Sequence, residues 1–187
     1  MTRSRVIARP ASGAHVFVDE TKRRDYLLVA GVVIAGDLDA VRAVLRELVL
    51  PGQRRLHMNS ESDPRRRSIA SAITSSPLRA TVYNAGRRYK TERDRRAACL
   101  QSLVNDAAEH GHGVLVLEQD DSLLSWDTQH LIEFTRAAGC RDSLRYEHRR
   151  AASEHLLAIP DAIAWCWAKG GDWRRRIEPA VADVQQV

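Results

Sequence analysis

The chain has 187 residues, of which 44% are hydrophobic and 28% are charged. That length suits one domain with a sizeable buried core, and the composition is ordinary for a globular protein. The longest apolar run covers residues 26–35, which is much shorter than the roughly 20 residues of a membrane-spanning helix. The N-terminus is basic, but no apolar signal-peptide core follows it. We therefore expect a cytoplasmic protein with no membrane partner.

The net charge of +5 rests mostly on arginine, because Lys22, Lys90 and Lys169 are the only lysines. Arginine clusters recur at residues 54–55, 65–67, 87–88, 93–96, 149–150 and 174–176. Such an excess fits a polyanionic partner, since the forked N–H groups of arginine match phosphate oxygens. We expect that partner to be a nucleic acid, DNA or RNA. For any single cluster, the alternative is an ordinary solvated surface.

The first part of the chain predicts a pair of strands and then a helix. Residues 1–13 are expected to form a flexible lead-in. Residues 15–18 and 26–34 are apolar runs of strand length, and a polar turn joins them. Residues 39–50 place apolar side chains on one helical face, and Pro51-Gly52 ends that pattern.

The middle of the chain continues with short strands and two further helices. Residues 55–58 are a candidate brief strand. Ser62 as N-cap and Pro64 in the first turn predict a helix over residues 63–74. Residues 79–84 then form a strand. A long helix begins at Thr91, with Asp94 completing a capping pattern, and Gly111 stops it.

The last part of the chain begins with a fully apolar strand over residues 114–118, typical of one covered on both faces. A helix over residues 126–138 follows, and residues 144–148 form a short strand or a loop. Pro160 suits the first turn of a last helix, which Gly170-Gly171 closes.

A strand pair followed by alternating helices and strands predicts an α/β protein with a mixed central sheet and helices on both faces. We expect one domain over residues 14–180, with residues 181–187 as a C-terminal tail. The oligomeric state is left open, with a homodimer as one alternative.

Acidic residues follow the apolar runs at three places. Asp19-Glu20 end the first run, Glu118 ends the run at 114–117, and Asp161 lies in the first turn of the last helix. Carboxylates at such positions are costly to bury unless a positive charge meets them. Each has an ordinary alternative: a turn entry for Asp19-Glu20, exposed loop acids for Glu118 with Asp120 and Asp121, and a favourable helix dipole for Asp161.

A shared cation site is the economical explanation for these acids. Because successive strand residues face opposite sides, only one of Asp19 and Glu20 is expected to enter the site. Oxygen ligands from strand ends and a helix start suit Mg²⁺ or Mn²⁺, and two such ions could activate a water against a phosphodiester. The candidate metal ligands are Asp19, Glu118, Asp121 and Asp161. The candidate catalytic residues are Asp19, Glu20, Glu118, Asp161 and His57.

His57 lies in a predicted loop or brief strand and could position substrate or transfer a proton, since histidine titrates near neutrality. An incidental loop histidine is the alternative. Arg65, Arg67, Arg87 and Arg88 are candidate contacts to nucleic-acid phosphates, with a basic solvated surface as the alternative.

Several other classes of site are excluded by missing motifs. The sequence has no GxxxxGK[ST] or GxGxxG phosphate loop, no HExxH pair and no GxSxG elbow. Cys99, Cys140 and Cys166 show neither a CxxC pattern nor zinc-ligand spacing, so we expect buried free thiols.

The chain resembles domain-of-unknown-function family 3800, a bacterial group with a ribonuclease-H-like fold. The resemblance spans about residues 14–180. Its motifs are Phe17-Val18-Asp19-Glu20, the apolar strand at 26–34, Leu56-His57, and Leu156-Leu157-Ala158-Ile159-Pro160-Asp161-Ala162-Ile163-Ala164-Trp165.

By this resemblance the first-strand acid of the family corresponds to Asp19, with Glu20 beside it. Its late helix acid corresponds to Asp161 and its histidine to His57. The central acid corresponds to Glu118 or to the following Asp120 and Asp121. Members commonly have Ser-Gly after the first acids, where this chain has Thr21-Lys22. The resemblance implies a ribonuclease-H-like sheet and, by analogy, a metal-dependent nuclease.

Two other functions compete with a nuclease. One is a non-catalytic nucleic-acid-binding module that keeps the fold. The other is a protein-interaction domain in which Trp165, Trp167 and Trp173 form a partner surface, although core packing is the more common role of such residues.

Overall fold

The structure, a computed structural model, describes residues 13–187, so all but the last residue of the predicted lead-in lies outside it. It contains six strands: β1 (His15–Thr21), β2 (Tyr26–Val33), β3 (Leu78–Gly86), β4 (Val114–Glu118), β5 (Arg145–Arg149) and β6 (Val181–Gln186). Its α-helices are α1 (Leu38–Glu47), α2 (Asp63–Thr74), α3 (Glu92–Glu109), α4 (Leu124–Ala137), α5 (Ala158–Lys169) and α6 (Gly171–Ile177).

All six strands belong to one mixed sheet with the order β5-β4-β1-β2-β3-β6. β2 pairs antiparallel with both β1 and β3, whereas β4 pairs parallel with β1 and β5, and β6 pairs parallel with β3. Only β2 therefore runs against the others. The carboxyl ends of the other five strands lie at one side of the sheet, which we call the carboxyl edge.

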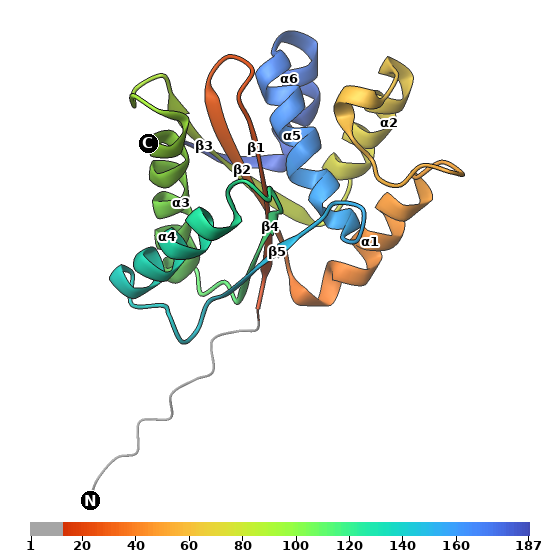
Figure 1. The fold of residues 1–187 in the computed structure, drawn as a ribbon. Helices are drawn as coiled ribbons and strands as arrows, with labels where there is room; N and C mark the ends of the chain where they lie inside the picture. Colours follow the sequence, from red (N-terminus) through yellow and green to blue (C-terminus); the bar gives the residue numbers. More distant parts are fainter. Residues whose placement is uncertain (1–12) are drawn as a thin grey trace, which may run out of the picture.

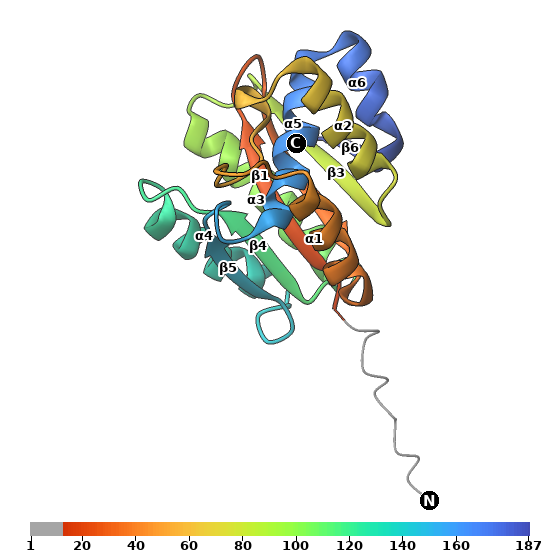
Figure 2. The same ribbon diagram turned by 90° about the vertical axis from the view of Figure 1, so that its right-hand side faces the viewer.

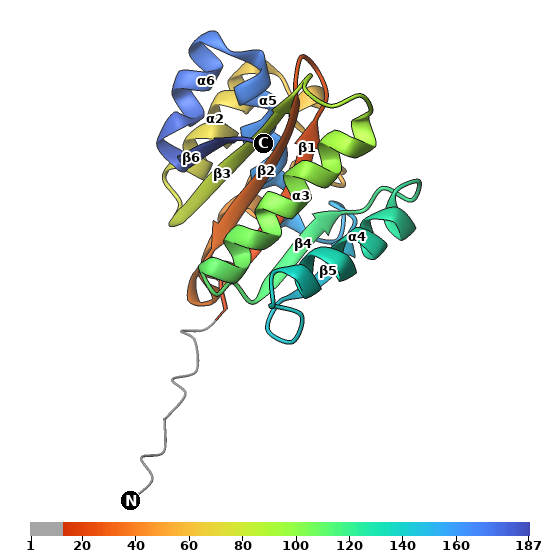
Figure 3. The same ribbon diagram turned by 90° about the vertical axis from the view of Figure 1, so that its left-hand side faces the viewer.

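Helices cover both faces of this sheet (Figure 1). α1, α2, α5 and α6 lie on one face (Figure 2), and α3 and α4 lie on the other (Figure 3). An antiparallel β1–β2–β3 meander, followed by β4 and β5 parallel to β1, gives a ribonuclease-H-like α/β fold. This confirms the fold expected from the sequence. Among the helices of residues 13–187, none is long and apolar enough to cross a bilayer.

Alternation along β1 divides its side chains between two hydrophobic cores. Val16 and Val18 pack with α3 and α4, whereas Phe17 packs with α5. The same alternation sends Asp19 to the α5 face and Glu20 to the α3 face. The sequence pattern predicted this separation of the two acids.

Local signals in the sequence fix several element boundaries. The Thr91 hydroxyl accepts from Asp94 N–H and the Asp94 carboxylate accepts from Thr91 N–H, both at 3.1 Å, which makes the predicted capping box. Past the end of α3, Gly111 has a φ of 67°, a left-handed conformation that glycine adopts without steric cost. α2 covers residues 63–74 as predicted, and residues 145–149 form the strand β5.

Three expectations about elements were wrong. Residues 55–58 form no strand, because Met58 N–H donates to Asp161 Oδ2 at 2.8 Å and a 3-10 turn starts there. The apolar face predicted for the helix at residues 39–50 included Val44, but in α1 this side chain is 38% exposed. Residues 181–187 are not a tail: β6 extends the sheet beside β3, and α6 precedes it. Its polar side chains gave no strand signal because an edge strand stays largely in solvent.

Candidate functional site

Three of the predicted acids converge at the carboxyl edge, on the α5 face. Val18 of β1 pairs with Leu117 of β4, so the next residues, Asp19 and Glu118, end neighbouring parallel strands. α5 packs across β1 and β2 and carries Asp161 in its first turn. Side chains that lie more than 100 positions apart in the sequence thus face one region.

Asp19 experiences the electrostatic effect of this convergence most strongly. Burial raises the pKa of the Asp19 carboxyl well above its usual value. The neighbouring carboxylates of Glu118, Glu20 and Asp161, in decreasing order, raise that pKa further. Asp19 therefore sits in a negative, poorly solvated environment that a cation would stabilise.

Asp161 is held by the loop before α2. Its Oδ2 accepts the Met58 N–H at 2.8 Å, and its Oδ1 lies 3.2 Å from His57 Nδ1. Because an ionised carboxylate only accepts, His57 Nδ1 donates in this contact. The hydrogen bond to Asp161 raises the pKa of His57, even though partial burial acts in the opposite direction.

Glu118 is held by a residue that the sequence analysis did not select. The Arg55 guanidinium donates to Glu118 Oε1 from the same loop that carries His57. Glu118 stays partly accessible, with 24% of its side chain exposed. Asp121, a few residues further on, is exposed and forms an ion pair with Arg150 at 2.8 Å.

Glu20 faces a different set of partners on the α3 side of the sheet. Arg96 of α3 donates to Glu20 Oε2 at 2.7 Å and to both oxygens of Asp127 in α4, at 2.6 and 2.7 Å. The Tyr26 hydroxyl accepts from the same guanidinium at 3.2 Å. Glu20 thus belongs to a buried ion-pair network on the α3 face, although its charge also acts on Asp19.

Arg96 and Asp127 were missed by the sequence analysis, although a signal for both exists. Arg96 lies on the buried stripe of α3, four residues before Leu100, and Asp127 lies on the stripe of α4, four residues before Leu131. A charged residue at an apolar position of an amphipathic helix needs a partner. Two such positions of opposite charge indicate a buried pair.

The four predicted phosphate-contacting arginines differ in their surroundings. Arg65 donates to Glu61 Oε2 at 3.0 Å and to the Leu48 carbonyl, so its head group is already engaged within the protein. Arg67 is exposed on α2. Arg87 and Arg88 are exposed and follow β3, so they lie at the same carboxyl edge as the acids.

An open hollow of about 420 Å³ lies beside Asp19 and Glu118, and Asp161 is not among its lining residues. Its lining residues are Asp19, Glu20, Glu118, Gln119, Asp120 and Asp121. Carboxylate oxygens are the donors that Mg²⁺ and Mn²⁺ prefer, so the chemistry of this set fits such a cation. Within residues 13–187, however, no three His, Cys, Asp or Glu side chains are arranged closely enough to hold an ion. Glu118 would have to turn away from Arg55 to complete a set of ligands.

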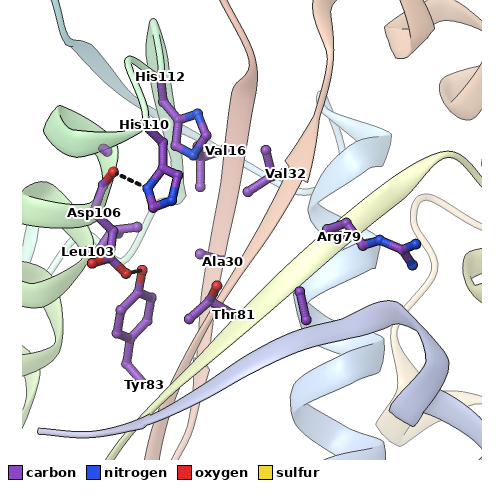
Figure 4. Close-up of a pocket in the computed structure, with 12 residues that line it drawn as sticks. Val16, Ala30, Val32, Arg79, Thr81, Tyr83, Leu103, Asp106, His110 and His112 are labelled. Atoms are coloured by element: carbon purple, nitrogen blue, oxygen red, sulfur yellow. Dashed lines mark hydrogen bonds between the residues drawn. The ribbon is translucent and has the colours of Figure 1, made fainter.

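A second hollow, of about 260 Å³, lies near the amino ends of β1 and β3 (Figure 4). It is lined mainly by apolar side chains, with Asp106 as the one carboxylate among its described lining residues. Asp106 Oδ2 already accepts from the Tyr83 hydroxyl and from Gln185 Nε2, each at 2.7 Å. This hollow therefore lacks the cluster of acids found at the carboxyl edge.

The tryptophans and cysteines contribute to the core. Trp165 and Trp167 are buried, 6% and 8% exposed, which favours core packing over a partner surface. The three cysteines are free and buried, as expected, and burial raises the pKa of the Cys99 and Cys166 thiols to about 12. They are therefore poor nucleophiles at neutral pH.

Comparison of the chain with protein-family models and with curated proteins gave no match.

Proposed function

We propose that this protein is a divalent-metal-dependent nuclease that hydrolyses phosphodiester bonds of DNA or RNA. The observation that carries the proposal is the convergence of Asp19, Glu118 and Asp161 at the carboxyl edge, on one face of a ribonuclease-H-like sheet. In open α/β sheets, ligands commonly bind outside the carboxyl ends of the strands. Fold alone does not define activity, so the acids themselves are the argument.

In this proposal Asp19, Glu118 and Asp161 hold Mg²⁺ or Mn²⁺. When bound, such an ion activates a water and offsets the charge that develops on the phosphate. His57, hydrogen bonded to Asp161 and 33% exposed in its side chain, orients that carboxylate and can donate a proton to the leaving oxygen. Glu20 and Asp121 lie at the margins of the site and assist it through their charge.

The basic residues around the edge supply contacts to the polyanion. Arg87 and Arg88 follow β3, and Arg149 and Arg150 end or follow β5, so positive charge flanks the acids on two sides. Phosphate contacts of this kind position a strand without reading its sequence. We also propose that the chain is related to domain-of-unknown-function family 3800. Its free buried thiols are compatible with action in the cytoplasm.

A non-catalytic nucleic-acid-binding module is the second candidate, and one observation favours it. Arg55 pairs with Glu118, and His57 and the Met58 N–H satisfy Asp161, so two of the three acids already have partners from the protein. A protein that binds no cation could keep these contacts to Glu118 and Asp161 permanently.

Cleavage of end-labelled single-stranded DNA, duplex DNA and RNA with Mn²⁺, Mg²⁺ or EDTA tests the proposal. We expect cation-dependent cleavage that Asp19→Asn and Asp161→Asn abolish. Asp172→Asn, which removes an exposed acid of α6, is the matched control and is expected to retain it. Full cleavage by Asp19→Asn would overturn the assignment, and salt-sensitive binding without cleavage would support the second candidate.

A further inference from the structure

A third hollow adjoins the acid-lined one, and arginines are prominent in its lining. It measures about 370 Å³ and is lined by Arg54, Arg55, Glu118, Gln119, Arg150, Ala151 and Ala152. Glu118 and Gln119 line both hollows, so the two spaces meet at the Glu118 side chain. We call this third space the arginine hollow.

Each acid next to the arginine hollow is met by one of its arginines. Arg55 donates to Glu118, and Arg150 Nη2 donates to both oxygens of Asp121, at 2.8 and 3.1 Å. These guanidinium groups remain accessible, since the side chains of Arg55 and Arg150 are 38% and 62% exposed. A guanidinium carries five N–H donors, so each keeps donors free for another anion.

We propose that the arginine hollow binds a phosphate of the nucleic-acid strand, and that Arg55 exchanges partners: it pairs with Glu118 in the cation-free protein and with the phosphate once a divalent cation takes Glu118. This inference rests on the proposed nuclease function and adds to it a phosphate subsite beside the scissile bond.

The exchange is favoured by competition for one carboxylate. Arg55 and a cation compete for the one Glu118 carboxylate. An ion pair as exposed as this one is weak, so a divalent ion displaces it readily. The released guanidinium stays within the arginine hollow, where Arg54 and Arg150 already gather positive charge. A phosphate presents two oxygens to a guanidinium fork, whereas Arg55 makes one contact with Glu118.

Substitution of Arg55 gives two readouts of opposite sign. Arg55→Gln removes the competitor for Glu118, so calorimetric Mn²⁺ binding without nucleic acid should become about twofold to fivefold tighter. Binding of a fluorescein-labelled single-stranded oligonucleotide should become about threefold to tenfold weaker. A plot of log K against log salt concentration should also be less steep by about 0.7, because one phosphate contact to a single strand is lost. Arg55→Lys keeps the charge without the fork and should bind the oligonucleotide with intermediate affinity.

Arg141→Gln is the matched control, because it removes one exposed arginine from the turn before β5, at the opposite edge of the sheet. It should leave the Mn²⁺ affinity unchanged and change oligonucleotide binding less than Arg55→Gln does. Unchanged Mn²⁺ affinity in Arg55→Gln would overturn the exchange, and unchanged oligonucleotide affinity would overturn the phosphate subsite. If the wild-type protein binds no Mn²⁺, the proposed function itself fails. The wild-type titration thus separates that failure from a failure of the exchange, which the Arg55 variants test.

Discussion

Gly31 of β2 lies directly beneath α5, and its replacement by alanine should disturb both the fold and the site. A Cβ at this position would lie 2.8 Å from Ile159 Cγ2 and 3.6 Å from Ile159 Cβ. Carbon atoms in good contact are about 3.5–4.0 Å apart, so Ile159 must retreat by about 1 Å. Ile159 is fully buried and β-branched within a helix, which leaves its side chain little freedom to rotate. The helix itself therefore has to move.

Overpacking of this kind costs about 1–3 kcal/mol of unfolding free energy. Asp161 follows Ile159 by two residues in α5, so it should move by a similar distance away from Asp19. A displacement of about 1 Å in a catalytic group can lower the rate about 100-fold. We therefore expect Gly31→Ala to be moderately destabilised and to lose most of any cleavage activity.

Urea denaturation, followed by cleavage at saturating Mn²⁺, measures the two effects. Gly36→Ala is the control, because a Cβ there meets no atom within 4 Å, and this variant should match the wild type. In the Ile159→Ala background, Gly31→Ala should cost much less, since the opposing methyl group is absent. A Gly31→Ala protein as stable as wild type, or the same cost in both backgrounds, would refute the steric reasoning.

Two further predictions concern charge. In cation-free buffer, Asp19→Asn should raise the free energy of unfolding at neutral pH by about 0.5–2 kcal/mol, because the neutral amide avoids burying a charge beside other carboxylates. Burial and neighbouring acids raise the pKa of Asp19, so the wild type loses stability as the pH rises above the ordinary pKa of aspartate. In urea titrations, the difference in unfolding free energy between Asp19→Asn and the wild type should vanish below about pH 3. Asp127→Ala leaves the Arg96 guanidinium buried, with Glu20 as its remaining charged partner among the described residues. Urea denaturation should show a free energy of unfolding lower by about 3–5 kcal/mol. Asp172→Ala, which breaks an exposed pair, should change it little.

Much of the fold could be predicted because its signals are local. The run before Asp19 and the run before Glu118 are apolar throughout, as expected for strands covered on both faces. The capping box at Thr91 and the proline in the first turn of α5 mark helix starts within a few residues. Each of these signals involves residues that are close together in the chain, so it can be recognised from the sequence alone.

Other features could not be predicted because they depend on partners distant in the chain. β6 is largely polar and exists as a strand because the free edge of β3 offers hydrogen bonds to it. Arg55 looks like any arginine of a basic loop until that loop crosses the end of β4 and meets Glu118. Alternation predicted that Asp19 and Glu20 separate, but which of them meets Asp161 depends on the side of the sheet that α5 covers.

At the carboxyl edge, the acids on the α3 face of the sheet and those on the α5 face are neutralised in different ways. This difference indicates on which face an external cation would bind. On the α3 face, a buried guanidinium donates to Glu20 and Asp127 at once, and Lys22 lies 3.8 Å from Glu20. The charges of both carboxylates are thus offset from within the protein, and His148 Nε2 also lies 3.4 Å from Asp127 Oδ2. On the α5 face, Arg55 pairs with Glu118 and His57 with Asp161, and both of these partners are partly exposed. Asp19 lines the hollow of about 420 Å³, is buried beside other acids, and forms no ion pair with any residue of the described range 13–187. A divalent ion there has most to stabilise at this carboxylate.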